Sequence, residues 1–256
     1  MAQMKTPGVY IIEKNAFPNS VVEVATAIPA FIGHTQFARD GNKDLTGIPF
    51  RISSMAEFHS FFGFAPTLRF GIRPEDSESE DTTNDINVLF PDGSCQLTLP
   101  KTFYALYYNM LLFYANGGGP CYIVSVGDYE HDFKSIDFTN ALLALKKEQE
   151  PTLVVVPEAV YMEEGDCYKV QTAALMHCGN DMKNRFAILD VFNGYKDENG
   201  AVIKSFRENI GSNFLAYCAS YYPWINTSIV TEKDITFYNI EKDSLEKLEE
   251  LILNEF

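Results

Sequence analysis

The sequence has no long apolar run and no leader-like start, and each absence narrows the class of protein. None of its apolar stretches approaches the ~20 residues that a helix needs to span a bilayer, so no transmembrane segment is predicted. The start of the chain (MAQMKTPGVYIIEKN) lacks an apolar core behind basic residues, so no secretory signal is predicted.

Basic residues are scarce. The chain holds 20 Lys and Arg against 35 Asp and Glu, which gives a formal net charge of −15. Proteins that bind nucleic acid draw much of their affinity from phosphate contacts, so nucleic-acid binding is not predicted. The same excess of negative charge opposes docking on anionic membranes.

Metal-binding and disulfide patterns are also missing. The five cysteines are odd in number and widely spaced, and they form no CxxC pattern, which is typical of reduced, mostly buried thiols in a cytosolic protein. They are Cys95, Cys121, Cys167, Cys178 and Cys218. The four histidines form no HxH or HExxH spacing, so no metal site and no cofactor is predicted.

What the sequence does contain is a regular alternation in its second half. Helical spacing over 136–150, 167–180 and 201–222 alternates with apolar β-prone runs over 152–156 and 186–191. This order predicts an α/β (mixed α+β) fold with a central, mostly parallel sheet and flanking helices. The two runs are expected to be adjacent parallel strands, covered by the helices around residues 142 and 175.

The first half is less regular. Pro29 lies inside the apolar run 27–33, which predicts an edge or interrupted strand. A serine cap and Gly63 frame a short helix over 53–62, and helical spacing over 100–116 precedes a buried strand over 121–127.

The expected organisation has four parts. Residues 1–20 form an N-terminal arm, and residues 21–130 an α/β region with an acidic loop insertion at 64–97. Residues 131–230 form the second α/β region, and residues 231–256 an amphipathic tail with leucines in helical register from Asp243 onward.

Chemistry-bearing groups are few. No GxSxG motif occurs, and Ser125 lies in a strand pattern without a matched histidine. The pair His177-Cys178 fits either a metal site or two residues of one helix face. Asp190 ends a strand at the carboxyl edge of the predicted sheet, where it fits either a catalytic group or a carboxylate that caps the following turn.

Three further patterns have structural interpretations. The glycine-rich loop 116–120 follows a helix and precedes a strand, the reverse of the order in phosphate-binding loops, so it predicts a helix end. The aromatic residues Phe103, Tyr107, Phe113 and Tyr114 are predicted to be core. The acidic run 75–81 lacks the alternating spacing of a calcium loop and is expected on the solvated surface.

Several segments resemble, in the same order, stretches of the contractile tail sheath proteins of phages and of phage-tail-like contractile injection systems. They are residues 5–13 (KTPGVYIIE), 24–35 (VATAIPAFIGHT), 54–63 (SMAEFHSFFG), 113–124 (FYANGGGPCYIV), 185–190 (RFAILD) and 221–224 (YYPW). Each match is short, but their common order extends over most of the chain.

The resemblance implies a structural protein that polymerises around an inner tube and contracts to drive it through a target envelope. It implies a subtilisin-like domain at 131–230, without catalytic residues, and an arm that adds a strand to a neighbouring subunit. The arm residues are Gly8, Val9, Tyr10, Ile11, Ile12 and Glu13. The implied partners are copies of the chain or paralogues, the tube protein, and baseplate and terminator proteins. Assembly is expected in the cytoplasm of the producing bacterium, before release as a particle.

One departure from the family leaves alternatives open. Family members continue past the YYPW segment into a tube-contacting domain, whereas this sequence stops soon afterwards in an acidic amphipathic segment. It is therefore expected to be a sheath fragment, a truncated chain, or a short cap or terminator protein. The remaining alternative is an α/β hydrolase or nucleotide-binding enzyme, which the alternation and Asp190 suggest.

Overall fold

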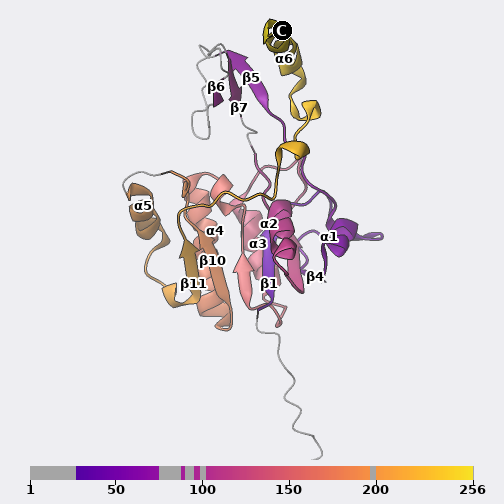
Figure 1. Ribbon diagram of the computed structural model, residues 1–256. Helices are drawn as coiled ribbons and strands as arrows, with labels where there is room; N and C mark the ends of the chain where they lie inside the picture. The colour runs from indigo at the N-terminus through magenta and orange to yellow at the C-terminus, as the bar shows by residue number, and fades with distance from the viewer. Residues whose placement is uncertain (1–26, 75–87, 90–94, 99–101, 197–199, 256) are drawn as a thin grey trace, which may run out of the picture.

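The computed structural model describes residues 27–74, 88–89, 95–98, 102–196 and 200–255, and its centre is a six-stranded sheet (Figure 1). The strands lie in the order β11-β10-β9-β1-β8-β4. Their bounds are β1 Pro29–Gly33, β4 Phe50–Ile52, β8 Cys121–Ser125, β9 Leu153–Val155, β10 Phe186–Asp190 and β11 Cys218–Tyr221. All neighbouring pairs are parallel except β4 with β8, which confirms the predicted α/β fold.

The chain starts this sheet in the middle. On one side of β1 lies β8, and beyond it β4, which precedes β8 in the sequence. On the other side lie β9, β10 and β11 in sequence order. The direction of strand addition therefore reverses between β1 and β9. In open α/β sheets, ligands bind beyond the carboxyl ends of the strands near such a reversal.

Helices cover both faces of the sheet. Their bounds are α1 Met55–Phe62, α2 Leu106–Ala115, α3 Ser135–Leu145, α4 Glu164–Met176, α5 Ala201–Ile210 and α6 Lys242–Glu255. Shorter turns of helix are η1 Ala159–Tyr161, η2 His177–Met182 (a π-helix), η3 Leu215–Tyr217, η4 Glu232–Asp234 and η5 Phe237–Asn239.

Two apolar clusters fill the space between sheet and helices. Side chains of α3, α4 and α5 pack on one face, and side chains of α1 and α2 pack on the other. The strands divide their residues between the clusters with a period of two, as in β1, where Ala30 and Ile32 face the first cluster and Phe31 the second.

The position of β1 corrects one expectation. Pro29 predicted an edge or interrupted strand, yet β1 is fully buried and lies between β8 and β9. The proline is the first residue of the strand, a position where the missing N–H disturbs the ladder least. The strand beyond it therefore pairs on both sides.

Several boundaries differ from those expected. The predicted helices over 100–116 and 136–150 are shorter, since α2 begins at Leu106 and α3 ends at Leu145. Leu143 of α3 is 52% exposed, so it does not face the core. The predicted helix over 201–222 is wrong beyond Ile210. There Gly211 adopts φ 75°, a left-handed conformation that ends α5, and the chain returns as strand β11.

The range 64–97 is not wholly a loop. It contributes a small antiparallel sheet of β5 Gly71–Pro74, β7 Cys95–Thr98 and β6 Val88–Leu89. This sheet and α6 project together from one end of the main body (Figure 1), where the N–H of Ile72 donates to Oγ of Ser244 over 2.9 Å. β2 Arg39–Asp40 and β3 Lys43–Asp44 form a two-stranded hairpin. The acidic run 75–81 lies outside the described residues.

Candidate functional site

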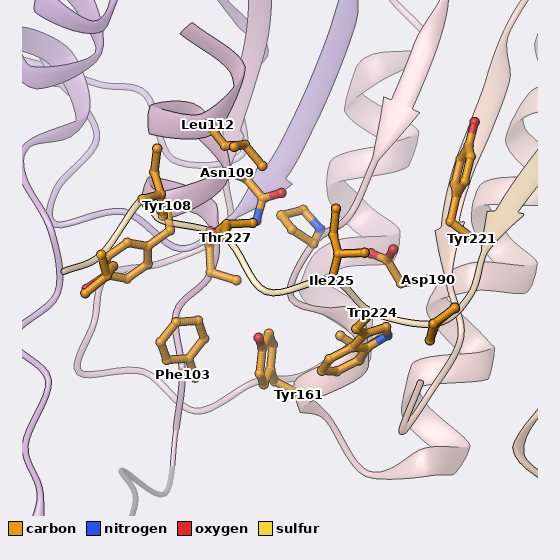
Figure 2. Close-up of a pocket in the computed structure, with 16 residues that line it drawn as sticks. Phe103, Tyr108, Asn109, Leu112, Tyr161, Asp190, Tyr221, Trp224, Ile225 and Thr227 are labelled. Atoms are coloured by element: carbon orange, nitrogen blue, oxygen red, sulfur yellow. The ribbon is translucent and has the colours of Figure 1, made fainter. Parts of the chain in front are cut away.

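A pocket of about 420 Å³ lies beyond the carboxyl ends of β9, β10 and β11 (Figure 2). Pro157, Asp190 and Tyr221 reach it from these three strand ends, and α2 forms another wall. The segment 223–230 crosses over the opening on its way from β11 toward α6. The pocket is therefore built where parallel sheets present their ligand sites, and aromatic and aliphatic side chains dominate its lining.

Asp190 is the pocket's charged residue. Its backbone oxygen accepts a hydrogen bond of 2.7 Å from Nε2 of Gln171, whereas its carboxylate has no hydrogen-bond or ion-pair partner among the described residues. Burial raises the pKa of this carboxyl above its ordinary value. The expected role as a cap of the following turn is not seen, because Gly194 closes that turn with its N–H on the oxygen of Val191, at 2.9 Å.

Trp224 also lines the pocket, close to Asp190 (Figure 2), and is fixed by hydrogen bonds. Its indole Nε1–H donates to the backbone oxygen of Val191 over 2.9 Å, and its backbone N–H donates to the oxygen of Gly194 over 3.0 Å. The Tyr195 and Tyr161 rings lie 5.3 and 6.1 Å away, centroid to centroid. The strand β10, its turn and the YYPW segment thus hold the indole in one place.

A buried carboxylate, Glu158, sits at the point where the strand order reverses. One carboxylate oxygen accepts from Nδ1 and from the backbone N–H of His34, over 2.8 and 2.9 Å. The other oxygen accepts from the N–H of Leu106, the first residue of α2, over 3.2 Å. Ala105 offers α2 no side-chain cap, so Glu158 supplies one from a segment 52 residues away.

Gly33 makes room for this arrangement. A Cβ at residue 33 would lie 2.9 Å from Cβ of Leu106 and 3.0 Å from the carboxyl carbon of Glu158. The end of β1, the start of α2 and Glu158 therefore approach each other more closely than any side chain at position 33 allows.

The described residues contain no nucleophile–base pair at Ser125. The hydroxyl of Ser125 is 2.6 Å from the hydroxyl of Thr35, while the nearby His34 is engaged by Glu158. A hydrolase of the serine type needs its hydroxyl within hydrogen-bond reach of a base. The structure places these residues close together at the carboxyl ends of β1 and β8 without forming that pair.

His177 and Cys178 belong to a buried ion-dipole cluster. Nη1 of Arg185 donates to Nε2 of His177 over 2.8 Å and to the backbone oxygen of Leu145 over 3.0 Å, and Nη2 donates to the oxygen of Glu148. Burial raises the pKa of Cys178 to about 12. The described residues hold no group of three His, Cys, Asp or Glu side chains with metal-binding geometry.

A pH dependence follows from this cluster. Burial lowers the pKa of His177 from 6.5 to about 4. The positive charges of Arg185 and Lys146 also lower it, and the negative charge of Asp181 opposes them. Below pH 6.5 His177 therefore takes up a proton in the unfolded chain but stays neutral in the folded chain. The stability that is present above that pH is lost as the pH falls. Between pH 7.5 and 5 this histidine should remove about 2 kcal/mol from the free energy of unfolding.

Urea unfolding at pH 7.5, 6 and 5 measures this loss. The His177→Gln variant keeps an oxygen that can accept from Arg185 and should show a flatter pH dependence. The His131→Gln variant alters an exposed histidine and serves as the matched control. Equal slopes in the parent and the His177→Gln variant would contradict the assignment.

The other patterns have structural roles. Asn116 ends α2, and the N–H of Gly118 donates to the oxygen of Phe113 over 2.9 Å, so the glycine-rich loop closes a helix as expected. Tyr107, Phe113 and Tyr114 pack in or against the second apolar cluster. Phe103 was expected in the core but lines the pocket instead.

The predicted inter-subunit residues, Gly8 to Glu13, lie outside the described residues. Within the described ranges, no helix combines the length and apolarity that crossing a bilayer requires. The chain matches no protein-family model, and it matches no curated protein.

Proposed function

We propose that the chain is a structural subunit of a contractile tail sheath, without catalytic activity of its own. The observation that carries this proposal is the ordered series of sheath-like segments between residues 5 and 224. Four of these segments supply β1, the end of α2 with β8, β10, and the end of β11. These four of the six segments therefore contribute to one sheet.

The chemistry of the described residues agrees with a structural role. The hydroxyl of Ser125 contacts the hydroxyl of Thr35 and not a base. The hydrogen bonds of Glu158 to His34 and to Leu106 connect the segments that follow β1 and β9 with the start of α2. A buried, fully engaged carboxylate of this kind holds a frame together. The proposed partners are other copies or paralogues, an inner tube protein, and baseplate and terminator proteins.

Assembly would depend on residues 8–13. The segment Val9 to Ile12 is β-prone and short, and Pro7, Asn15 and Pro18 separate it from the rest of the chain. A strand of this length is unstable alone and gains hydrogen bonds by adding to the edge of a neighbour's sheet. In the proposed sheath, this arm links successive subunits in the cytoplasm of the producing bacterium, before the particle is released.

Electron microscopy of the full-length gene product, produced together with its tube protein, tests the proposal. The parent should form sheath-like tubes, whereas the Ile11→Pro variant, which removes a ladder N–H, should stay a folded monomer. The Gln3→Pro variant, outside the predicted strand, should assemble like the parent.

Each other outcome has a definite meaning. Tubes built by the Ile11→Pro variant would overturn the arm mechanism. A parent that caps the end of a sheath without polymerising would identify a tail-completion protein. A parent that binds neither tube nor sheath would overturn the proposed function.

A further inference from the structure

We propose that the pocket beneath the segment 223–230 binds an alkylammonium group, with the Asp190 carboxylate as its counter-charge and Tyr161 and Trp224 as its aromatic wall. This site does not depend on the sheath proposal, because it rests on the charge and shape of the pocket alone.

The first observation is the unpaired carboxylate. Asp190 is the charged residue among those that line the pocket, and no described cation pairs with it. Asp190 is half-buried, and a carboxylate partly withdrawn from water is stabilised when a proton or a cation neutralises it. Figure 2 shows the Asp190 carboxylate directed toward Ile225, another residue that lines the pocket, so a ligand inside the pocket can reach it.

The second observation is the row of aromatic rings. The Phe103 and Tyr161 centroids are 5.0 Å apart, and those of Tyr161 and Trp224 are 6.1 Å apart, so the three rings form one continuous wall (Figure 2). Aromatic faces attract organic cations, most strongly when the site excludes water. They also cover the alkyl chain that follows an ammonium group.

Size and acceptors fit the same ligand class. A volume of about 420 Å³ is in the range of small-molecule sites. Beside Asp190, the pocket offers the hydroxyl of Tyr161 and the side-chain oxygen of Asn109, whose Nδ2 is already committed to the oxygen of Ala105 over 2.9 Å. An ammonium group carries three donors and matches such acceptors, whereas an anion would be repelled by Asp190.

An inorganic cation fits less well. Divalent metals prefer several oxygen ligands, often with further carboxylates, and no described group of three metal-ligating side chains exists in the pocket or elsewhere. The apolar lining would leave most of a metal's coordination sites without partners. The apolar lining instead favours an organic cation with an alkyl chain.

The protein contains a built-in reporter for this site. Its sequence holds one tryptophan, Trp224, and that residue lines the pocket. Titration of the purified full chain with n-butylammonium, followed by Trp224 fluorescence and by calorimetry, should show saturable binding. The neutral analogue 1-butanol should bind roughly tenfold more weakly, because it offers Asp190 no charge.

Two variants test the role of the carboxylate. Asp190→Asn keeps the shape of the side chain and should abolish the preference for n-butylammonium over 1-butanol. Glu163→Gln removes an exposed carboxylate that does not line the pocket and should leave that preference unchanged. The Asp190→Asn variant should unfold at the parent temperature or above it, because it removes an unpaired charge.

The remaining outcomes are decisive. Equal affinity for n-butylammonium and 1-butanol in the parent, or an unchanged preference in Asp190→Asn, would overturn the proposal. An Asp190→Asn variant that unfolds well below the parent temperature would assign the residue to the frame and not to a ligand. Tighter binding of Nα-acetyl-lysine amide than of 1,4-diaminobutane would point to a lysine side chain of a partner. The reverse order would point to a free amine.

Discussion

The Val154→Asp variant should fail to fold at ambient temperature. Val154 is 1% exposed and lies in β9, where it pairs with Ala30 of β1 on one side and Ala187 of β10 on the other. Its side chain packs in the cluster formed with α3 and α4, so an aspartate there would be buried without a partner. The expected loss in the free energy of unfolding is on the order of 4 kcal/mol or more.

Circular dichroism and thermal unfolding of the purified variant measure this loss. Ser220→Asp is the matched control, because Ser220 also lies in a strand of the sheet, β11, but is exposed. It should melt within a few degrees of the parent, as surface substitutions generally do. If Val154→Asp also melted like the parent, the position of β9 in the centre of the sheet would be wrong.

The second large effect is expected for Glu158→Ala. This change removes the acceptor for three donors, which are Nδ1 and the N–H of His34 and the N–H of Leu106. Each buried donor left without a partner costs about 1–3 kcal/mol, so the free energy of unfolding should fall by roughly 4 kcal/mol. The start of α2 should loosen as well, because the helix loses its cap.

Urea unfolding gives the energy, and hydrogen exchange at the first turn of α2 gives the local effect. Glu158→Gln keeps one acceptor oxygen and should lose about half as much. Glu163→Ala changes an exposed glutamate whose side chain makes no capping hydrogen bond, and it should be close to neutral. Normal exchange protection of α2 in Glu158→Ala would show that the helix does not depend on this carboxylate.

The strands that could be predicted from the sequence are those whose apolar and β-branched residues indicate a buried strand. The run 152–156 is rich in β-branched side chains and 186–191 is apolar except for Asp190, and the two runs form neighbouring parallel strands. The strand β11 (CASY) has no such run, and its sequence predicts a continuation of the preceding helix. Its place in the sheet comes from pairing with β10, which local propensity cannot reveal.

The candidate site was only partly predictable for the same reason. Asp190 is predictable as a site residue because it ends a largely apolar strand, and ligands bind near the carboxyl ends of such strands. No local sequence pattern indicates the role of Glu158, because its partner His34 lies 124 residues earlier in the sequence. The pocket itself required Trp224, Phe103 and Tyr161 to meet from three separate parts of the chain, a contact that no periodicity encodes.

The central place of β1 affects how the protein folds while it is being synthesised. Residues 29–33 leave the ribosome early, but the strands that enclose them, β8 and β9, begin at Cys121 and Leu153. At translation rates of about 5–20 residues per second, this apolar segment stays without its partners for on the order of ten seconds. During that interval its edges are open to other nascent chains. Faster translation shortens this interval and should therefore raise the soluble yield of the protein.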